Sequence, residues 1–257
     1  MEDLIKDLKE KFRDENIKPH DKENVQLAVG LAYADMSRHA NGHREEIKND
    51  CVKWLIKEIE KYSDNESSFD AWHETKCKAL KNELTNSSKT HKCSFKGTIG
   101  RAQKVINMTF KYLLVLDDKK YDSIKNQLHM ALDSYTLKWY NRIKSDEQKA
   151  FDSWNKIDDY TDYKNIQDTI KKYLSNDDTD HFYDASFTVK ANNKTIKFND
   201  DRQILLPNNA FEAEFIIWEG EKKKEEYKNV IKTRINYKKD KWFIDEKLDK
   251  GLKEKLK

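Results

Sequence analysis

The sequence has little proline, glycine and cysteine, and these shortages limit what it can fold into. Only two prolines and six glycines occur among 257 residues, while 38% of the side chains are charged. This composition is typical of a soluble and mostly helical protein. The three cysteines, at 51, 77 and 93, are odd in number and lack CxxC spacing. We therefore expect free thiols in a reducing compartment, the cytoplasm.

Long apolar runs and a charge imbalance are missing as well. No window holds the roughly 18 consecutive apolar residues of a membrane span, and the acidic start MEDLIKDL does not resemble a secretory leader. The 50 basic and 47 acidic side chains leave a net charge of only +3. Binding to nucleic acid would therefore depend on a local basic patch. We expect a monomer without membrane contact, built as one large domain or a main domain with a smaller appendage.

Apolar residues recur at helical spacing through most of the first 175 residues. This spacing predicts helices over 2–15, 22–39, 44–62, 69–84, from the glycine-containing stretch to 114, 121–128, 132–143, 146–156 and 162–174. The polar run TNSSKTHK at 85–92 predicts a loop.

The period changes after SNDDTD at 175–180. FTVKANNKTIKF alternates apolar and polar residues around an Asn-Asn turn, which predicts a hairpin. RQILLP, FEAEFIIWE and KTRINYKKDKWFID predict further strands. The fold class expected is mainly α, with a helical body over 1–180 and a β-rich segment over 181–257 that packs on the body (α+β).

The stretch FKGTIGRAQKVINMTFK at 95–111 contains two of the six glycines, three residues apart at the start of an apolar helix. A tight glycine turn that leads into a helix N-terminus can bind a phosphate group through its backbone amides. The amides of Gly97, Thr98, Gly100 and Arg101 are the candidates, and the side chains of Lys96 and Arg101 would add charge. The alternative interpretation is an ordinary helix start.

A second stretch, HMALDSYTLKWYNR at 129–142, places an aspartate at a helix entrance. Together the two stretches resemble the helix-hairpin-helix DNA glycosylases over about residues 94–143. The separation of 29 between Lys104 and Asp133 (133 − 104) is nearer the divergent archaeal branch that removes 8-oxoguanine. Phage-defence glycosylases acting on glucosylated hydroxymethylcytosine are related to that branch. The hairpin lacks the apolar-Pro-Gly opening, and no four-cysteine iron–sulfur cluster follows.

The resemblance implies excision of a flipped, modified base from double-stranded DNA without a metal or other cofactor. Asp133 would stabilise positive charge on the sugar and activate water or a lysine. Lys104 is the matching lysine, but it lies three residues after Arg101 instead of directly after it, so Lys111 remains an alternative nucleophile. An extruded base needs aromatic faces and a few polar groups. The candidates for this pocket are His129, Tyr135, Trp139, Tyr140 and Trp72.

Another class of function fits the same residues. In a non-enzymatic helical binding or regulatory protein, Asp133 is a plain helix cap, Lys104 is an exposed lysine, and Trp139 and Tyr140 belong to the core. A nuclease of another class is a third possibility. His39 and His43 have helical ligand spacing but no third ligand, so we expect no metal site.

Overall fold

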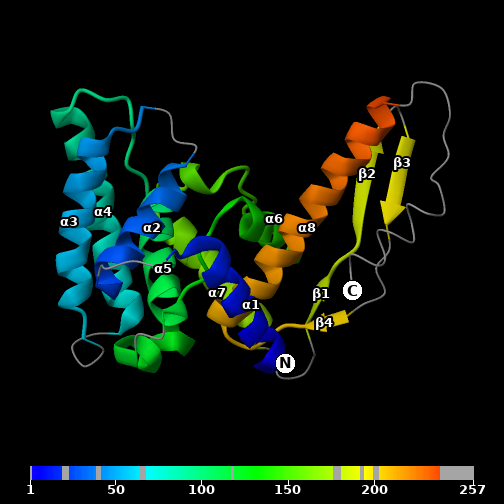
Figure 1. The fold of residues 1–257 in the computed structure, drawn as a ribbon, viewed down its shortest axis with the longest axis horizontal. Helices are drawn as coiled ribbons and strands as arrows, with labels where there is room; N and C mark the ends of the chain where they lie inside the picture. Colours follow the sequence, from blue (N-terminus) through cyan, green and yellow to red (C-terminus); the bar gives the residue numbers. More distant parts are fainter. Residues whose placement is uncertain are drawn as a thin grey trace. The chain divides into compact units, whose positions relative to one another are not determined.

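The protein is mainly helical, as predicted (Figure 1). The computed structural model describes residues 2–18, 23–38, 42–63, 68–116, 119–175, 181–191, 194–198 and 203–237. The α-helices are α1 (Glu2–Asn16), α2 (Asn24–Ser37), α3 (Glu45–Glu60), α4 (Phe69–Thr90), α5 (Ile99–Val115), α6 (Ser134–Ile143), α7 (Tyr160–Leu174) and α8 (Ala210–Tyr237). The described residues also form two 3-10 helices, η1 (Lys119–Gln127) and η2 (Trp154–Lys156).

The chain divides into two compact units. The first contains residues 1–183 and 204–219, and the second contains residues 184–203 and 220–257. Helix α5 is central to the first unit, because every residue from Val105 to Val115 is buried. Helices α1, α2, α4 and α7 all pack against α5. These neighbours leave little of α5 in contact with water, so its buried polar side chains, among them Gln103, Asn107 and Lys111, bond within the protein.

Polar caps start several of these helices where the sequence offers them. The side chains of Ser68, Thr98, Asp133 and Asp159 accept hydrogen bonds from backbone N–H groups in the first turns of α4, α5, α6 and α7. Such caps satisfy donors that have no partner inside the helix. The start of each of these helices is therefore determined locally.

The second unit contains the predicted hairpin. Strands β2 (Phe187–Ala191) and β3 (Lys194–Phe198) pair antiparallel, with Phe187 opposite Phe198. The predicted Asn-Asn turn at 192–193 lies outside the described residues. In the same unit Lys224 donates to the backbone oxygen of Asp184 and pairs with Glu221 at 3.2 Å.

The predicted strand RQILLP is confirmed in part. Strand β4 (Gln203–Leu205) pairs with β1 (Phe182–Asp184) in a second two-stranded sheet. The predicted strand over 232–245 is wrong where it is described, because 232–237 belong to α8. Residues 238–245 lie outside the described part of the chain.

The strand predicted for FEAEFIIWE is also wrong, because these residues form the first turns of α8. Their alternation of apolar and polar residues arises from burial on more than one side of the helix. Phe12 of α1 packs against Phe215 with ring centroids 5.6 Å apart, and Lys111 of α5 pairs with Glu214. Asn209 starts the helix by accepting a hydrogen bond from the backbone N–H of Glu212 at 2.9 Å.

Two further expectations need correction. Helix α4 continues through the predicted loop to Thr90, because its polar side chains find partners: Ser87 donates to Asp50 at 2.6 Å and Ser88 donates to the backbone oxygen of Cys93 at 3.0 Å. Only 154–156 of the predicted helix 146–156 is helical. Asn141 bonds both backbone groups of Phe151 and holds that segment along α6.

Candidate functional site

Asp133 is the N-cap of α6, at the helix entrance where the sequence predicts it. Its Oδ1 accepts hydrogen bonds from the backbone N–H groups of Tyr135 at 2.8 Å and Thr136 at 3.0 Å. The Thr136 hydroxyl accepts from the Asp133 backbone N–H at 2.9 Å, which completes a capping box. Asp133 is half-buried, and its two bonds to backbone amides fix the orientation of the carboxylate.

An indole that the sequence did not indicate lies beside this carboxylate. Trp218 Nε1 donates to Asp133 Oδ2 at 3.2 Å, and the Trp218 and Tyr135 rings meet edge to face at 5.9 Å between centroids. Both aromatic residues are half-buried. Of the predicted pocket aromatics, Tyr135 is therefore placed at Asp133. The sequence does not point to Trp218, because the alternation of its segment predicts a strand whereas the segment is helical.

Helix α5 is tied to the residue before Asp133 by one side chain. Gln103 Nε2 donates to the Leu132 backbone oxygen at 3.0 Å, and Gln103 Oε1 accepts from the Leu132 N–H at 3.2 Å. Lys104 follows Gln103 in the chain, just as Asp133 follows Leu132. The double hydrogen bond therefore brings the α5 turn that carries Lys104 next to the entrance of α6.

The Lys104 ammonium itself points to another aromatic residue. Its Nζ lies 4.7 Å from the centroid of the Trp154 ring, and the side chain is half-buried. Among the described residues, no hydrogen bond or ion pair joins Lys104 to Asp133. A direct role for Lys104 at the carboxylate would require rotation of its side chain away from Trp154.

Lys111, the alternative nucleophile, is enclosed. It is 2% exposed and its Nζ pairs with Glu214 Oε1 at 2.6 Å. The rings of Phe12 and Phe215 lie 4.7 and 4.3 Å from the same nitrogen. A lysine held in this way has no route to a sugar on the protein surface.

Gly97 and Gly100, at the start of α5, permit close packing with neighbouring segments. A Cβ at Gly97 would lie 2.2 Å from the Lys81 backbone oxygen, and a Cβ at Gly100 would lie 1.8 Å from the Trp154 backbone oxygen. The Gly100 N–H donates to the Ile157 oxygen at 2.8 Å. The Arg101 N–H donates to the Thr98 hydroxyl at 3.2 Å. Two of the amides predicted to bind phosphate are thus already bonded within the protein.

Gly97 and Thr98, whose amides are the other two candidates, are buried, so phosphate contact at this turn would depend on side chains. Lys96 is 70% exposed and its ion pair with Asp158, at 3.2 Å, lies at the surface, where a phosphate could replace the carboxylate at little cost. Arg101 donates to the Lys96 backbone oxygen and stacks over the Phe95 ring at 4.3 Å. These two cations flank the start of α5.

The other predicted pocket aromatics are used in packing. Trp139 is 3% exposed and meets the Tyr173 ring at 5.7 Å. Tyr140 is buried, and its hydroxyl donates to the Lys149 backbone oxygen at 3.2 Å. Trp72 belongs to an aromatic cluster with Tyr62 and two phenylalanines, with the Tyr62 ring 4.9 Å away. No described contact joins these three residues to Asp133.

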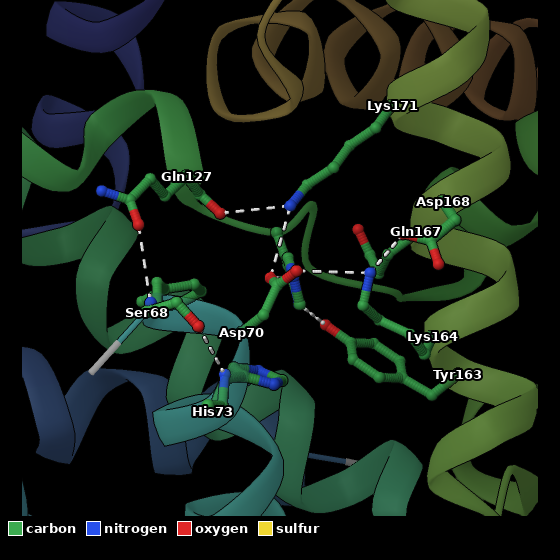
Figure 2. Close-up of polar contacts among 12 residues, drawn as sticks. Ser68, Asp70, His73, Gln127, Tyr163, Lys164, Gln167, Asp168 and Lys171 are labelled. Atoms are coloured by element: carbon green, nitrogen blue, oxygen red, sulfur yellow. Dashed lines mark hydrogen bonds and ion pairs between the residues drawn. The ribbon is translucent and has the colours of Figure 1, made fainter.

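His129 belongs to a buried chain of hydrogen bonds, and Figure 2 shows the part around Asp70 and Tyr163. A carboxylate can only accept, so His129 Nε2 donates to Asp70 Oδ1 at 2.6 Å and its Nδ1 accepts from the Tyr163 hydroxyl at 2.8 Å. The Tyr163 oxygen accepts from Asn107 at 2.9 Å, and Asn107 Oδ1 accepts from His73 at 2.9 Å. Among these bonds, only the one that His129 Nδ1 accepts from the Tyr163 hydroxyl requires a neutral imidazole, because a protonated ring can still donate through Nε2.

The pKa values of the titratable groups in these hydrogen bonds are shifted by neighbouring charges and by burial. The hydrogen bond from His129 holds the pKa of Asp70 well below its usual value, and Lys171 and Lys164 of α7 add to the effect at 3.4 and 3.3 Å (Figure 2). Burial lowers the pKa of His129, although its bond to Asp70 opposes the change. Burial also lowers the pKa of His73 far below its usual value, and a charge on His129 would lower it further.

These shifts predict lower stability in acid. Both histidines take up a proton near pH 6.5 when unfolded but resist it when folded, so the unfolded chain binds more protons below about pH 7. The urea midpoint should therefore fall between pH 7.5 and 5. The urea midpoint should fall further below about pH 4. There the unfolded chain takes up a proton at Asp70, while the folded protein, in which the pKa of Asp70 is lowered, does not yet do so.

The variant His129→Gln tests this origin. Glutamine can still donate to Asp70 but does not titrate, so the loss of stability between pH 7.5 and 5 should be smaller than in the unaltered protein. An equal loss in both proteins, measured by urea unfolding followed by circular dichroism, would assign the acid sensitivity to other groups.

Within the described ranges, no helix is long and apolar enough to cross a membrane. In the same residues, no group of three or more His, Cys, Asp or Glu side chains could hold a metal ion. His39 lies outside them. No known protein family, curated protein or solved structure matches this chain.

Proposed function

We propose that this protein is a DNA N-glycosylase in which Asp133 drives release of a flipped, modified base. The cap of α6 carries the proposal, because its two amide hydrogen bonds fix the Asp133 carboxylate beside the Trp218 and Tyr135 rings. Breakage of an N-glycosidic bond leaves positive charge on the sugar, which a fixed carboxylate stabilises. The same carboxylate can take a proton from the attacking water.

The surroundings of Asp133 suit this chemistry. The indole and phenol rings of Trp218 and Tyr135 offer apolar faces next to the carboxylate, as a base removed from the stack needs. Lys96 and Arg101 provide cations for the DNA backbone, a contact that holds DNA without reading its sequence. Because Lys104 lies over Trp154, water activated by Asp133 is the favoured nucleophile.

A non-enzymatic binding function is the second candidate, and one observation favours it. Asp133 already has a complete structural role, since the capping box with Thr136 uses Oδ1 fully. In that case Trp218 and Tyr135 would be ordinary packing residues at the helix entrance. Activity separates the two candidates.

The direct experiment measures base release. The protein is incubated with duplexes that carry unmodified bases, uracil, 8-oxoguanine, 5-hydroxymethylcytosine or its glucosylated form, and abasic sites are then cleaved with hot alkali. We expect strand cleavage in at least one modified duplex and no borohydride-trapped protein–DNA adduct. A trapped adduct would show that an amine of the protein attacks the sugar, and its loss in Lys104→Ala would assign Lys104 as the covalent nucleophile. Failure to release any of these bases by folded protein would favour the non-enzymatic function.

A further inference from the structure

The segment that leads to Asp133 has neither helical nor strand hydrogen bonds, and buried side chains replace them. Gln167 bonds both backbone groups of Met130 at 3.1 and 2.9 Å, and Gln103 does the same for Leu132. Between them, the Ala131 oxygen accepts from the Thr136 hydroxyl at 2.8 Å. Buried backbone groups must find partners, so these contacts fix the course of the chain into α6.

The remaining backbone group, the Ala131 N–H, is bonded by a charged side chain. It donates to Glu214 Oε2 at 2.8 Å, while Glu214 Oε1 accepts from Lys111. Glu214 is 3% exposed and belongs to α8, 83 residues away from Ala131 in the chain. Trp218, one helical turn after Glu214, donates to the Asp133 carboxylate. One face of α8 therefore contacts both Asp133 and the backbone two residues before it.

Stability alone is a poor explanation for this ion pair. Desolvation of two charges offsets most of their attraction, and well-packed apolar side chains often replace such pairs without loss of stability. The aromatic surroundings of Lys111 would accept an apolar side chain of similar length. A pair of apolar side chains would fill this space but would leave the Ala131 N–H without an acceptor. That acceptor is therefore what Glu214 contributes beyond packing.

We propose that Glu214 is a positioning residue for Asp133, and this inference rests on the glycosylase function proposed above. By bonding the Ala131 N–H, Glu214 sets the angle at which the chain enters α6 and so the place of the carboxylate. Lys111 neutralises the charge that this acceptor brings into the core. A carboxylate displaced by about 1 Å can lose on the order of a hundredfold in rate.

The test compares two double variants, because removal of one charge alone would leave the other buried and unpaired. Lys111→Met with Glu214→Gln removes both charges and keeps an oxygen acceptor for the Ala131 N–H. Lys111→Met with Glu214→Leu removes the charges and the acceptor. Thermal unfolding establishes that both variants fold, and single-turnover base release is measured on the duplex that the unaltered protein cleaves.

If Glu214 positions Asp133, the leucine variant should release base at least about tenfold more slowly than the glutamine variant. The Kd values of the two variants for the same duplex should agree within about threefold. The Ala131 amide should also exchange its hydrogen at least about tenfold faster in the leucine variant. Equal rates in the two variants, or a difference confined to Kd, would overturn the proposal.

The exchange measurement separates the two proposals. If the unaltered protein released no base from any duplex, the glycosylase function would fail, and amide exchange at Ala131 would still decide whether Glu214 holds this segment. Equal exchange in the two variants would reject the anchoring itself.

Discussion

Replacement of Asp133 by asparagine should lower the single-turnover rate of base release by about a hundredfold to a thousandfold while the protein stays folded. Asparagine is as good an N-cap as aspartate, so its side-chain oxygen can keep the bonds to the α6 amides. What disappears is the negative charge that stabilises the sugar cation and takes the proton from water, together with the acceptor for Trp218 Nε1, because the asparagine nitrogen can only donate. The rate is measured on the modified duplex that the unaltered protein cleaves.

Asp159→Asn is the matched control. Asp159 caps α7 as Asp133 caps α6, accepting from the Thr161 N–H at 2.6 Å, and it is exposed. This variant should release base at the rate of the unaltered protein. Full activity in Asp133→Asn would reject the glycosylase proposal. Equal losses in the two variants would mean that weaker caps, rather than lost chemistry, slow the reaction.

Replacement of Gly100 by alanine should destabilise the protein by about 3 kcal/mol or more, or prevent folding. The added Cβ would lie 1.8 Å from the Trp154 backbone oxygen, and a backbone atom cannot move aside as a side chain can. Separation of α5 from η2 would also break the bond from the Gly100 N–H to the Ile157 oxygen. Urea unfolding followed by circular dichroism measures the loss.

Gly30→Ala is the control for this substitution. Gly30 also lies in a helix, α2, but a Cβ there meets nothing within 4 Å. Alanine should therefore stabilise the protein by about 0.5 to 1 kcal/mol, since glycine loses more backbone freedom on folding. A similar effect at both glycines would show that the contact between Gly100 and Trp154 is not tight.

Local signals in the sequence predicted much of the helical body. Helices α1, α2, α3 and α7 were expected within a few residues of their observed bounds, because apolar spacing and polar caps are properties of neighbouring residues. The hairpin at 187–198 was predicted from alternation and its Asn-Asn turn in the same way. The role of Asp133 as a helix cap also follows from the sequence around it.

The wrong predictions concern segments whose conformation depends on contacts with distant elements. The first turns of α8 alternate like a strand, because α1 and α5 cover different sides of the helix. The last turn of α4 looks like a loop, because the partners of its serines lie at Asp50 and Cys93. An alternating or polar pattern cannot reveal which sides of a segment will be covered.

The sequence by itself predicted helices α1, α2, α3 and α7 and the presence of an aspartate at the start of α6. Only the tertiary structure decided what surrounds that aspartate, because its partners come from far along the chain. Trp218 is 85 residues from Asp133, and Glu214 is 103 residues from Lys111. A hydrogen bond or ion pair requires its atoms to lie within a few ångströms, and no local pattern encodes which distant side chains will meet.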